Sequence, residues 1–328
     1  MAKKKRRKRN RLATAATLLP LAIGLASNVP RAQPRPATTA AVVGGPMVVA
    51  CTLPFDSIKQ HHPIDDTCGP NGKAKPDSAQ AAQNQAKNNF CATGEPVNID
   101  FDVLHQLQKD AENQQISFGS DAQIPKDRSV LRSLPTKVGL IGEGTVGRIV
   151  AFVIKARYSN VGKGKGESVN CKLTKREDND IHIVLGEKSN QDDECSSVTA
   201  EMSPHFRPEV WDPSLLVNNN AHLYRFTGQI FFDASHKPCS GGTGSPKRSS
   251  IWELHPVYKV EICLDPNNNC KVDSEENWVD FSDRVGLEGS SETLLRLPDG
   301  VWGELPFAAV PRVKSGSPAS TSARAPAL

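Results

Sequence analysis

Acids and histidines alternate with apolar residues in three segments of this 328-residue chain, Asn179–Leu185, Val198–Ser203 and Ser250–Val257. In a β-strand, successive side chains point to opposite faces of the sheet. The polar members of the three segments then share one face, here called the acid/histidine face: Asp180, His182, Glu201, Glu253 and His255. Carboxylates and imidazoles bind metal ions, transfer protons and hydrogen-bond polar ligands, so this face is the first candidate site.

Two chemistries fit these residue types. Asp180, His182, Glu201 and His255 could coordinate Zn²⁺ or another divalent ion. Alternatively, His182 or His255 could act as a general base that a neighbouring carboxylate orients. Two structural explanations also stay open: a solvated sheet face with cross-strand ion pairs, or a polar network buried beneath the N-terminal helices.

The segment FFDASH adds a carboxylate and an imidazole just after a further predicted strand. Asp233 and His236 would lie in a loop that covers the same groove. A single residue of either type is more often a turn or capping residue than a ligand. We therefore place these two at the edge of the candidate ligand-binding face.

The loop between the first two predicted barrel strands, here called the cationic loop, is strongly basic. Between Lys155 and Arg176 the chain holds seven basic residues against one acid, Glu167. Five of the basic residues form a candidate anion-binding site: Lys163, Lys165, Lys172, Lys175 and Arg176. Glycines between them leave backbone amides exposed, which suits phosphate or an anionic polymer. A solvated loop without a ligand is the alternative.

Five strands follow one another in the second half of the chain. They are predicted at Thr145–Tyr158, Asn179–Leu185, Val198–Ser203, Leu223–Phe232 and Ser250–Cys263. A long first loop and an irregular link between the third and fourth strands match an OB-fold barrel, which binds ligands on its second and third strands and the flanking loops. The first strands of such barrels often contain a glycine or a bulge midway, and we expect neither in AFVIKA.

The sequence blocks NDIHIVL, TAEMSPHFRP, RFTGQIFFDASH and IWELHPVYKVEIC, in this order, resemble an uncharacterised family of exported bacterial proteins with an OB-like barrel. The blocks HHPIDDTCG and AKNNFCATG resemble the same family, so the resemblance covers residues 51–263. It implies export and the barrel, and it brings no activity to carry over.

Gly142, Gly144 and Gly147 reproduce the G-x-G-x-x-G spacing of dinucleotide-binding sites. That motif needs a helix to begin at the glycines, so that its amides meet the pyrophosphate. Residues 149–154 read IVAFVI, and their β-branched side chains favour a strand. We therefore expect a turn into the first barrel strand and disfavour NAD as a cofactor.

The first 26 residues have the order of a secretory signal peptide. Eight basic residues in the first eleven positions precede an apolar stretch from Leu12 to Ala26. The formal net charge of +4 includes these eight cations, so the mature chain is acidic, near −4, and lacks a broad field for non-specific nucleic-acid binding. A nucleic-acid-binding basic arm is the alternative. Lipidation at Cys51 is disfavoured because VVAC lies far beyond the apolar stretch.

Eight cysteines in an exported chain predict disulfide bonds. Cys263 and Cys270 flank a turn-forming hexapeptide suited to a local bridge, and Cys171 and Cys195 bracket a predicted strand. The N-terminal region holds three more: Cys51, Cys68 and Cys91. An odd number there predicts at least one link to the C-terminal half.

Helical patterns precede the strands, at Asp77–Asn89 and Ile99–Asn113, with a short third helix at Asp127–Leu134. The predicted boundaries are a signal peptide over 1–26, a linker over 27–50, a helical cysteine-containing region over 51–136, an OB-like barrel over 137–263, a C-terminal extension over 264–310 and a disordered tail over 311–328. The fold class is thus α+β: a small disulfide-bearing helical region followed by a five-stranded OB-like β-barrel.

We expect an exported or periplasmic binding protein that recognises a polar or anionic ligand, such as nucleic acid or an envelope polymer, through the acid/histidine face and the cationic loop. Two alternatives stay open. One is a metal-dependent secreted hydrolase of the phosphodiesterase or nuclease kind, and the other is a structural envelope protein without activity. The chain has no G-x-S-x-G, H-E-x-x-H or Walker A motif that would name a reaction.

Overall fold

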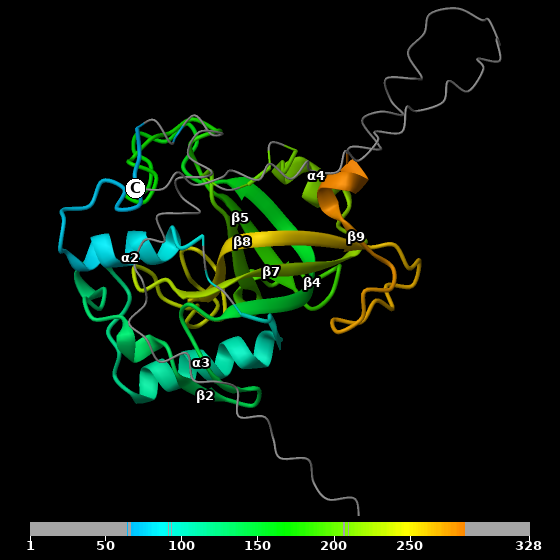
Figure 1. Cartoon of the computed structure of the whole chain (residues 1–328), viewed down its shortest axis with the longest axis horizontal. Helices are drawn as coiled ribbons and strands as arrows, with labels where there is room; N and C mark the ends of the chain where they lie inside the picture. Colours follow the sequence, from blue (N-terminus) through cyan, green and yellow to red (C-terminus); the bar gives the residue numbers. More distant parts are fainter. Residues whose placement is uncertain are drawn as a thin grey trace, which may run out of the picture. The chain divides into compact units, whose positions relative to one another are not determined.

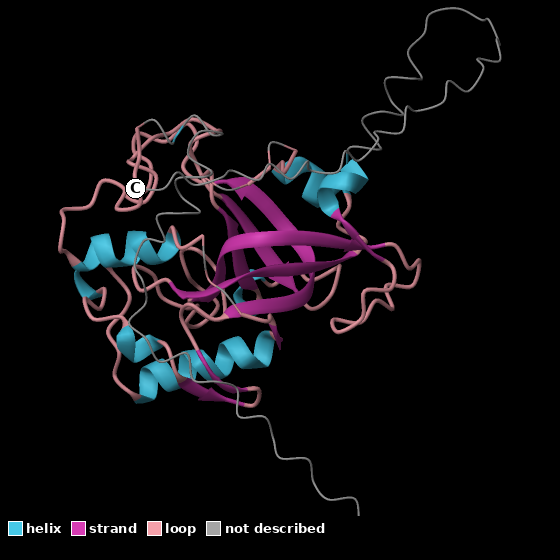
Figure 2. Cartoon of the chain, in the orientation of Figure 1, coloured by secondary structure: helices cyan, strands magenta, loops and turns pink. Residues whose placement is uncertain are grey.

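The strands predicted from the alternating sequence pattern form a closed barrel (Figures 1 and 2). The computed structural model describes residues 64, 67–90, 92, 94–205, 207–208 and 210–285, all within one unit of the chain, Val43–Leu328. The predicted signal peptide, linker and C-terminal tail lie outside the described residues, as do Cys51 and Cys91. No helix in the described part is long and apolar enough to cross a bilayer.

The barrel strands are β4 (Val146–Tyr158), β5 (Ile181–Gly186), β6 (Val198–Met202), β7 (Leu223–Phe232) and β8 (Trp252–Cys263). They pair in the order β4-β5-β6-β8-β7, and β7 pairs again with β4 to close the ring. The β6–β8 pair is parallel and the other four pairs are antiparallel. This order is that of an OB-fold barrel, and all five predicted strands are confirmed.

The first barrel strand bends so that its two halves serve different neighbours. Residues 146–152 of β4 pair with β7, and residues 152–158 pair with β5. The β4–β5 register shifts between Val153 and Lys155, so the expectation of a strand without a bulge is wrong. The bulge itself contains no glycine, because the glycine that makes room for it, Gly186, lies on the neighbouring strand β5. A Cβ on Gly186 would lie 2.7 Å from the Ile154 side chain.

Apolar side chains of alternate residues fill the barrel. Ile181, Ile183 and Leu185 of β5 are fully buried, as the sequence pattern predicts. On the neighbouring strands β7 and β8, the rings of the paired residues Phe232 and Trp252 pack with their centroids 4.9 Å apart. Burying large apolar side chains of this kind stabilises a fold by about 1.5–3 kcal/mol each.

The helices are α2 (Ala79–Lys87), α3 (Phe101–Asn113) and α4 (Pro213–Asn218), and residues 281–285 are also helical. The side chains of Ser78 and Asp100 cap the first turns of α2 and α3. The third predicted helix is reduced to a 3-10 turn at Ser129–Leu131. It is followed by a hairpin of β2 (Leu134–Thr136) and β3 (Gly139–Ile141).

Two short strands extend the barrel sheet at its edges. β1 (Val97–Ile99) pairs in parallel with the first residues of β4. β9 (Trp278–Asp280) pairs with the last residues of β8.

The glycine-rich segment before β4 is a turn and not a dinucleotide-binding loop. Gly142 precedes the turn, and a Cβ there would lie 2.0 Å from the Leu131 carbonyl oxygen. The residues that follow form β4 instead of a helix. The fingerprint therefore lacks the helix N-terminus that would receive a pyrophosphate, as expected from the sequence.

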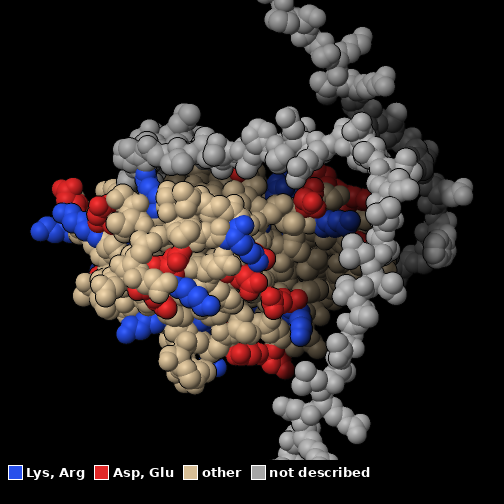
Figure 3. All heavy atoms as spheres, turned by 90° about the horizontal axis from the view of Figure 1, so that it is seen from below, with Lys and Arg blue, Asp and Glu red and all other residues tan. Residues whose placement is uncertain are grey.

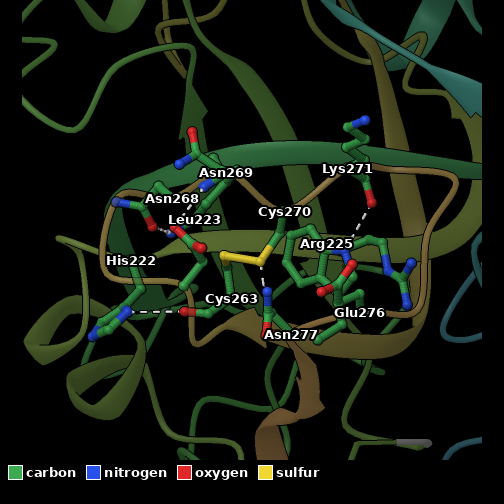
Figure 4. The surroundings of a disulfide bond; sticks show 12 residues. His222, Leu223, Arg225, Cys263, Asn268, Asn269, Cys270, Lys271, Glu276 and Asn277 are labelled. Carbon is green, nitrogen blue, oxygen red and sulfur yellow. Dashed lines mark hydrogen bonds between the residues drawn. A yellow bond between two sulfur atoms is a disulfide. The ribbon is translucent and has the colours of Figure 1, made fainter.

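Three disulfides connect the described cysteines: Cys68–Cys171, Cys195–Cys239 and Cys263–Cys270. The last confirms the predicted local bridge, and Figure 4 shows it beside the Cys263 carbonyl, which lies 3.0 Å from His222 Nδ1. Cys171 and Cys195, which bracket β5 in the sequence, do not bond to each other. Cys171 pairs with Cys68, and Cys195 pairs with Cys239. Cys68–Cys171 confirms the predicted link from the N-terminal region to the barrel.

The Cys68–Cys171 bridge should stabilise the protein more than the Cys263–Cys270 bridge does. Their sequence separations are 103 and 7 residues, so loop-closure entropy gives about 4.7 kcal/mol for the first and about 2.5 kcal/mol for the second. Paired Cys→Ser variants compared by urea denaturation measure both values. Equal losses in the two variants would contradict this entropic account.

Candidate functional site

The acid/histidine face lies on the outside of β5, β6 and β8, as predicted, and it is covered. Asp180, Glu201, Glu253 and His255 are at most 1% exposed. The side chain of His182 retains 16% exposure. The face is thus a polar network buried under the N-terminal region, and not an open ligand-binding surface.

Helix α2 supplies the cover, and its last residue supplies charge. Lys87 Nζ lies 3.4 Å from Glu201 Oε2 and 3.7 Å from Glu167 Oε2. A cation is also favoured there because the helix C-terminus carries partial negative charge. Burial alone would lower the pKa of Lys87, but the carboxylates, led by Glu201, raise it well above its ordinary value.

Glu201 lies at the centre of the network, between two histidines. One carboxylate oxygen is 2.7 Å from His255 Nδ1, and the other is 3.3 Å from His182 Nε2. Burial lowers the pKa of both imidazoles, yet the nearby carboxylates outweigh it and bring each to about 9. Burial would raise the pKa of Glu201, but His182 and Lys87 hold it well below its usual range.

The predicted edge residues join the same network through an arginine. Fully buried Arg248 bridges two acids, with Nη2 2.7 Å from Asp233 Oδ2 and Nη1 2.5 Å from Glu253 Oε2. His236 Nδ1 lies 2.6 Å from the same oxygen of Asp233. Burial would raise the pKa of Asp233, but Lys87, His236 and Arg248 hold it well below its ordinary value.

Asp180 has one carboxylate oxygen without a hydrogen-bond partner among the described residues. Asn170 Nδ2 donates to its Oδ2 at 2.8 Å, whereas Oδ1 has no hydrogen-bond partner among the described residues. Burial raises the pKa of this carboxyl group. Asp180 belongs to two sets whose potential ligand atoms lie within 4.8 Å of one another: Asp180, Glu201 and His255, and Glu167, Asp180 and His182. These acid and histidine groups could hold a metal ion.

We call the whole assembly the buried polar cluster. It consists of Lys87, Glu167, Asp180, His182, Glu201, Asp233, Arg248, Glu253 and His255. Five of these residues are acids, and only Lys87 and Arg248 are permanent cations. Buried charge of one sign is costly, so protons on the histidines and acids, or an added cation, must offset the difference.

The cationic loop does not belong to the acid/histidine face, but two of its residues contact the buried polar cluster. All five of its predicted anion-binding residues are exposed: Lys163, Lys165, Lys172, Lys175 and Arg176. Two of its other residues turn inward, because Glu167 contacts His182 at 3.3 Å and Asn170 donates to Asp180. The loop therefore has a basic outer surface and an acidic inner contact.

Sequence reasoning missed Lys87, Glu167, Arg248 and Asn170. The only signal for Lys87 was that it is the single charged residue of α2, whose other residues are Ala, Gln and Asn. Arg248 lies in a loop next to serines, where nothing distinguishes it from a solvated cation. Glu167 had been counted only as the one acid of a basic segment.

Comparison with known proteins adds little to this description. No family model and no curated protein matches the chain, so the resemblance to a family of exported bacterial proteins gains no support. One solved structure that matches is the crystal structure of yeast Stn1 and Ten1, at 8% identity and a TM-score of 0.26, over 66% of this chain and 83% of that one. The barrel assignment rests instead on the strand order.

Replacing Asp233 with Asn should remove part of the acid sensitivity of the fold. Because the pKa of Asp233 is lowered in the folded state, its stabilising effect is present above the unfolded value of about 3.9 and is lost as the pH falls. We expect Asp233→Asn to cost about 3–5 kcal/mol at pH 7, since it leaves Arg248 with one acid fewer.

Urea denaturation between pH 5 and pH 3 measures this effect. The free energy of unfolding should fall less with pH in Asp233→Asn than in the wild type. Exposed Asp192 provides the control, because Asp192→Asn should leave both the stability and its pH dependence unchanged. An Asp233→Asn protein as acid-sensitive as the wild type would show that Arg248 does not depend on this carboxylate.

Proposed function

We propose that the protein is an exported OB-barrel binding protein that takes an anionic polymer on its cationic loop. The observation that carries the proposal is an exposed group of five cations, three of which form no ion pair among the described residues. Among the ion pairs of the described residues, none engages Lys163, Lys165 or Lys172. Lys175 and Arg176 lie beside Glu177 and Asp212, at 3.9 and 3.0 Å.

The cationic loop is held in place, which lowers the entropic cost of binding. The Cys68–Cys171 bridge ties it to the segment before α2, and Lys73 N donates to the Ser168 carbonyl at 2.8 Å. In Figure 1 this blue segment runs beside the green loop. A connection of this length inside a compact fold is typical of a functional element.

The buried polar cluster contributes to this function by positioning the loop, not by contacting the ligand. Its contacts with Glu167 and Asn170 fix the inner side of the loop and leave the lysines pointing outward. The face that carries α3 and β2 differs from the outer side of the cationic loop, because basic and acidic side chains are interspersed there (Figure 3). A local basic surface on an otherwise acidic mature chain favours a specific anionic ligand.

The composition favours recognition of charge over recognition of bases. The chain has only three Tyr and four Trp, so aromatic platforms for stacking nucleotides are few. Lysines on a glycine-rich loop act as point charges for phosphate, sulfate or carboxylate groups. An envelope polymer or the backbone of a nucleic acid would both present such groups.

The burial of the acid/histidine face also bears on the two alternative functions, a hydrolase and a structural envelope protein. A hydrolase using His182 or His255 would need a substrate to reach groups that α2 covers, so the geometry does not favour it. A purely structural envelope protein is favoured by the same burial and by the three disulfides. The disulfides and the signal peptide predicted from the sequence both favour an exported, oxidising location.

Neutralising three loop lysines tests the proposal. The variant Lys163→Ser/Lys165→Ser/Lys172→Ser should bind heparin and single-stranded DNA at least about tenfold more weakly than the wild type at low salt. For DNA, the slope of log affinity against log salt should fall by about 2. Fluorescence anisotropy at several salt concentrations measures both quantities.

The control removes the same charge elsewhere. Lys109, Lys188 and Lys271 are exposed and lie on α3, after β5 and after β8. Their triple Ser variant should bind like the wild type. If the wild type binds neither polymer at low salt, the structural alternative holds. If both triple variants weaken equally, the binding is diffuse and the proposed loop site is wrong.

A further inference from the structure

We propose that Asp180, Glu201 and His255 form a buried site for one zinc ion that joins three barrel strands. Asp180 immediately precedes β5, and Glu201 and His255 lie on β6 and β8. Their potential ligand atoms lie within 4.8 Å of one another, and all three side chains are buried. One imidazole and two carboxylates are a ligand set that zinc accepts, with a water or a further side chain as the fourth ligand.

Buried polar atoms of this set lack hydrogen-bond partners among the described residues, and they indicate a missing ligand. Asp180 Oδ1 and His255 Nε2 are buried without a hydrogen-bond partner among the described residues. Leaving such atoms unsatisfied is costly, because they have lost their bonds to water without gaining others. A cation between the carboxylates and the imidazole would remove that cost at Asp180 and would turn an imidazole nitrogen into a ligand.

The charge of the surroundings favours a cation at this position. Glu167, Asp233 and Glu253 add three more acids, while Lys87 and Arg248 are the two permanent cations of the buried polar cluster. Low local dielectric strengthens the attraction of this excess for a divalent ion. A tetrahedral zinc ion places its ligand atoms about 3.3–3.6 Å apart, so modest side-chain rotations would complete the site.

Neighbouring residues already orient two of the ligands. Asn170 holds Asp180 Oδ2 at 2.8 Å, which leaves Oδ1 for the ion. The ring of Phe231 packs against His255 with centroids 5.6 Å apart. Supports of this kind fix ligand geometry and exclude water around metal ions.

A second, partly exposed set of potential ligands lies between the cationic loop and the site. Glu167, Asp180 and His182 form the second set of potential ligands, and it shares Asp180 with the first. The side chains of Glu167 and His182 are 26% and 16% exposed, so this outer set reaches the solvent. An ion could bind there first and then pass to the inner set through Asp180.

The site lies where the barrel is most weakly closed by its backbone. β6 and β8 pair over only two positions, Thr199 with Glu253 and Ala200 with Leu254. Glu201 and His255 are the next residues of the two strands. A zinc ion bound by both side chains would connect β6 and β8 at the point where their backbone hydrogen bonds end. Zinc binding should therefore stabilise the folded barrel.

Zinc binding is tested on the untagged, disulfide-bonded protein after removal of metals with a chelator. We expect about one equivalent of zinc by elemental analysis after reconstitution, and a rise in melting temperature on zinc titration. Cobalt substitution should give the visible absorption of a four-coordinate ion. Absence of both a stoichiometric metal and a thermal shift in the wild type would overturn the proposal.

Matched variants assign the ligands. Asp180→Asn keeps the shape of the side chain and should weaken zinc binding at least about tenfold, and His255→Gln should change or abolish the cobalt spectrum. Asp192→Asn removes an exposed charge outside the buried polar cluster and should retain one equivalent. Equal affinity in Asp180→Asn and wild type, or loss of zinc in Asp192→Asn, would contradict this ligand assignment.

Discussion

The ion pair between Glu201 and His255 bridges the seam on which the barrel depends. A five-stranded OB barrel closes only if its third and fifth strands meet, and here β6 and β8 share just two paired positions. The 2.7 Å contact between these side chains continues the closure beyond the backbone ladder. Because the contact is ionic and buried, it is stable only if the segments packed around it supply further charged or hydrogen-bonding partners.

That need explains why distant segments converge on one face. Glu201 requires Lys87, which fixes the end of α2, and Glu253 requires Arg248, which fixes the loop after β7. Glu167 brings the inner side of the cationic loop against His182. The groove in which an OB barrel ordinarily receives a ligand is therefore filled by the protein's own chain, and the exposed charge is displaced to the rim of that groove.

Local patterns predicted the barrel better than they predicted the state of its surface. Alternation identified all five strands and placed Asp180, His182, Glu201, Glu253 and His255 on one face, because strand geometry alone decides which side a residue takes. Burial is decided by what packs on top. Lys87 lies more than 90 residues before β5 in the sequence, and no local feature of either segment announces their contact. The bulge at Ile154 was missed for a similar reason, since Gly186 on the neighbouring strand makes the room.

The cationic loop carries opposite charge on its two sides, and this separation connects the anion-binding surface with the zinc site. The cationic loop presents lysines to the solvent and Glu167 to the cluster, so its outer cations are held apart from the acids of the cluster. The five acids of the cluster outnumber its two permanent cations, which suits protons on the histidines or a bound metal ion, while the lysines stay available for an anion. A solvated loop has no need of such separation, because its charges could pair with one another at little cost. Holding the two signs apart requires the disulfide and the buried contacts that this fold provides.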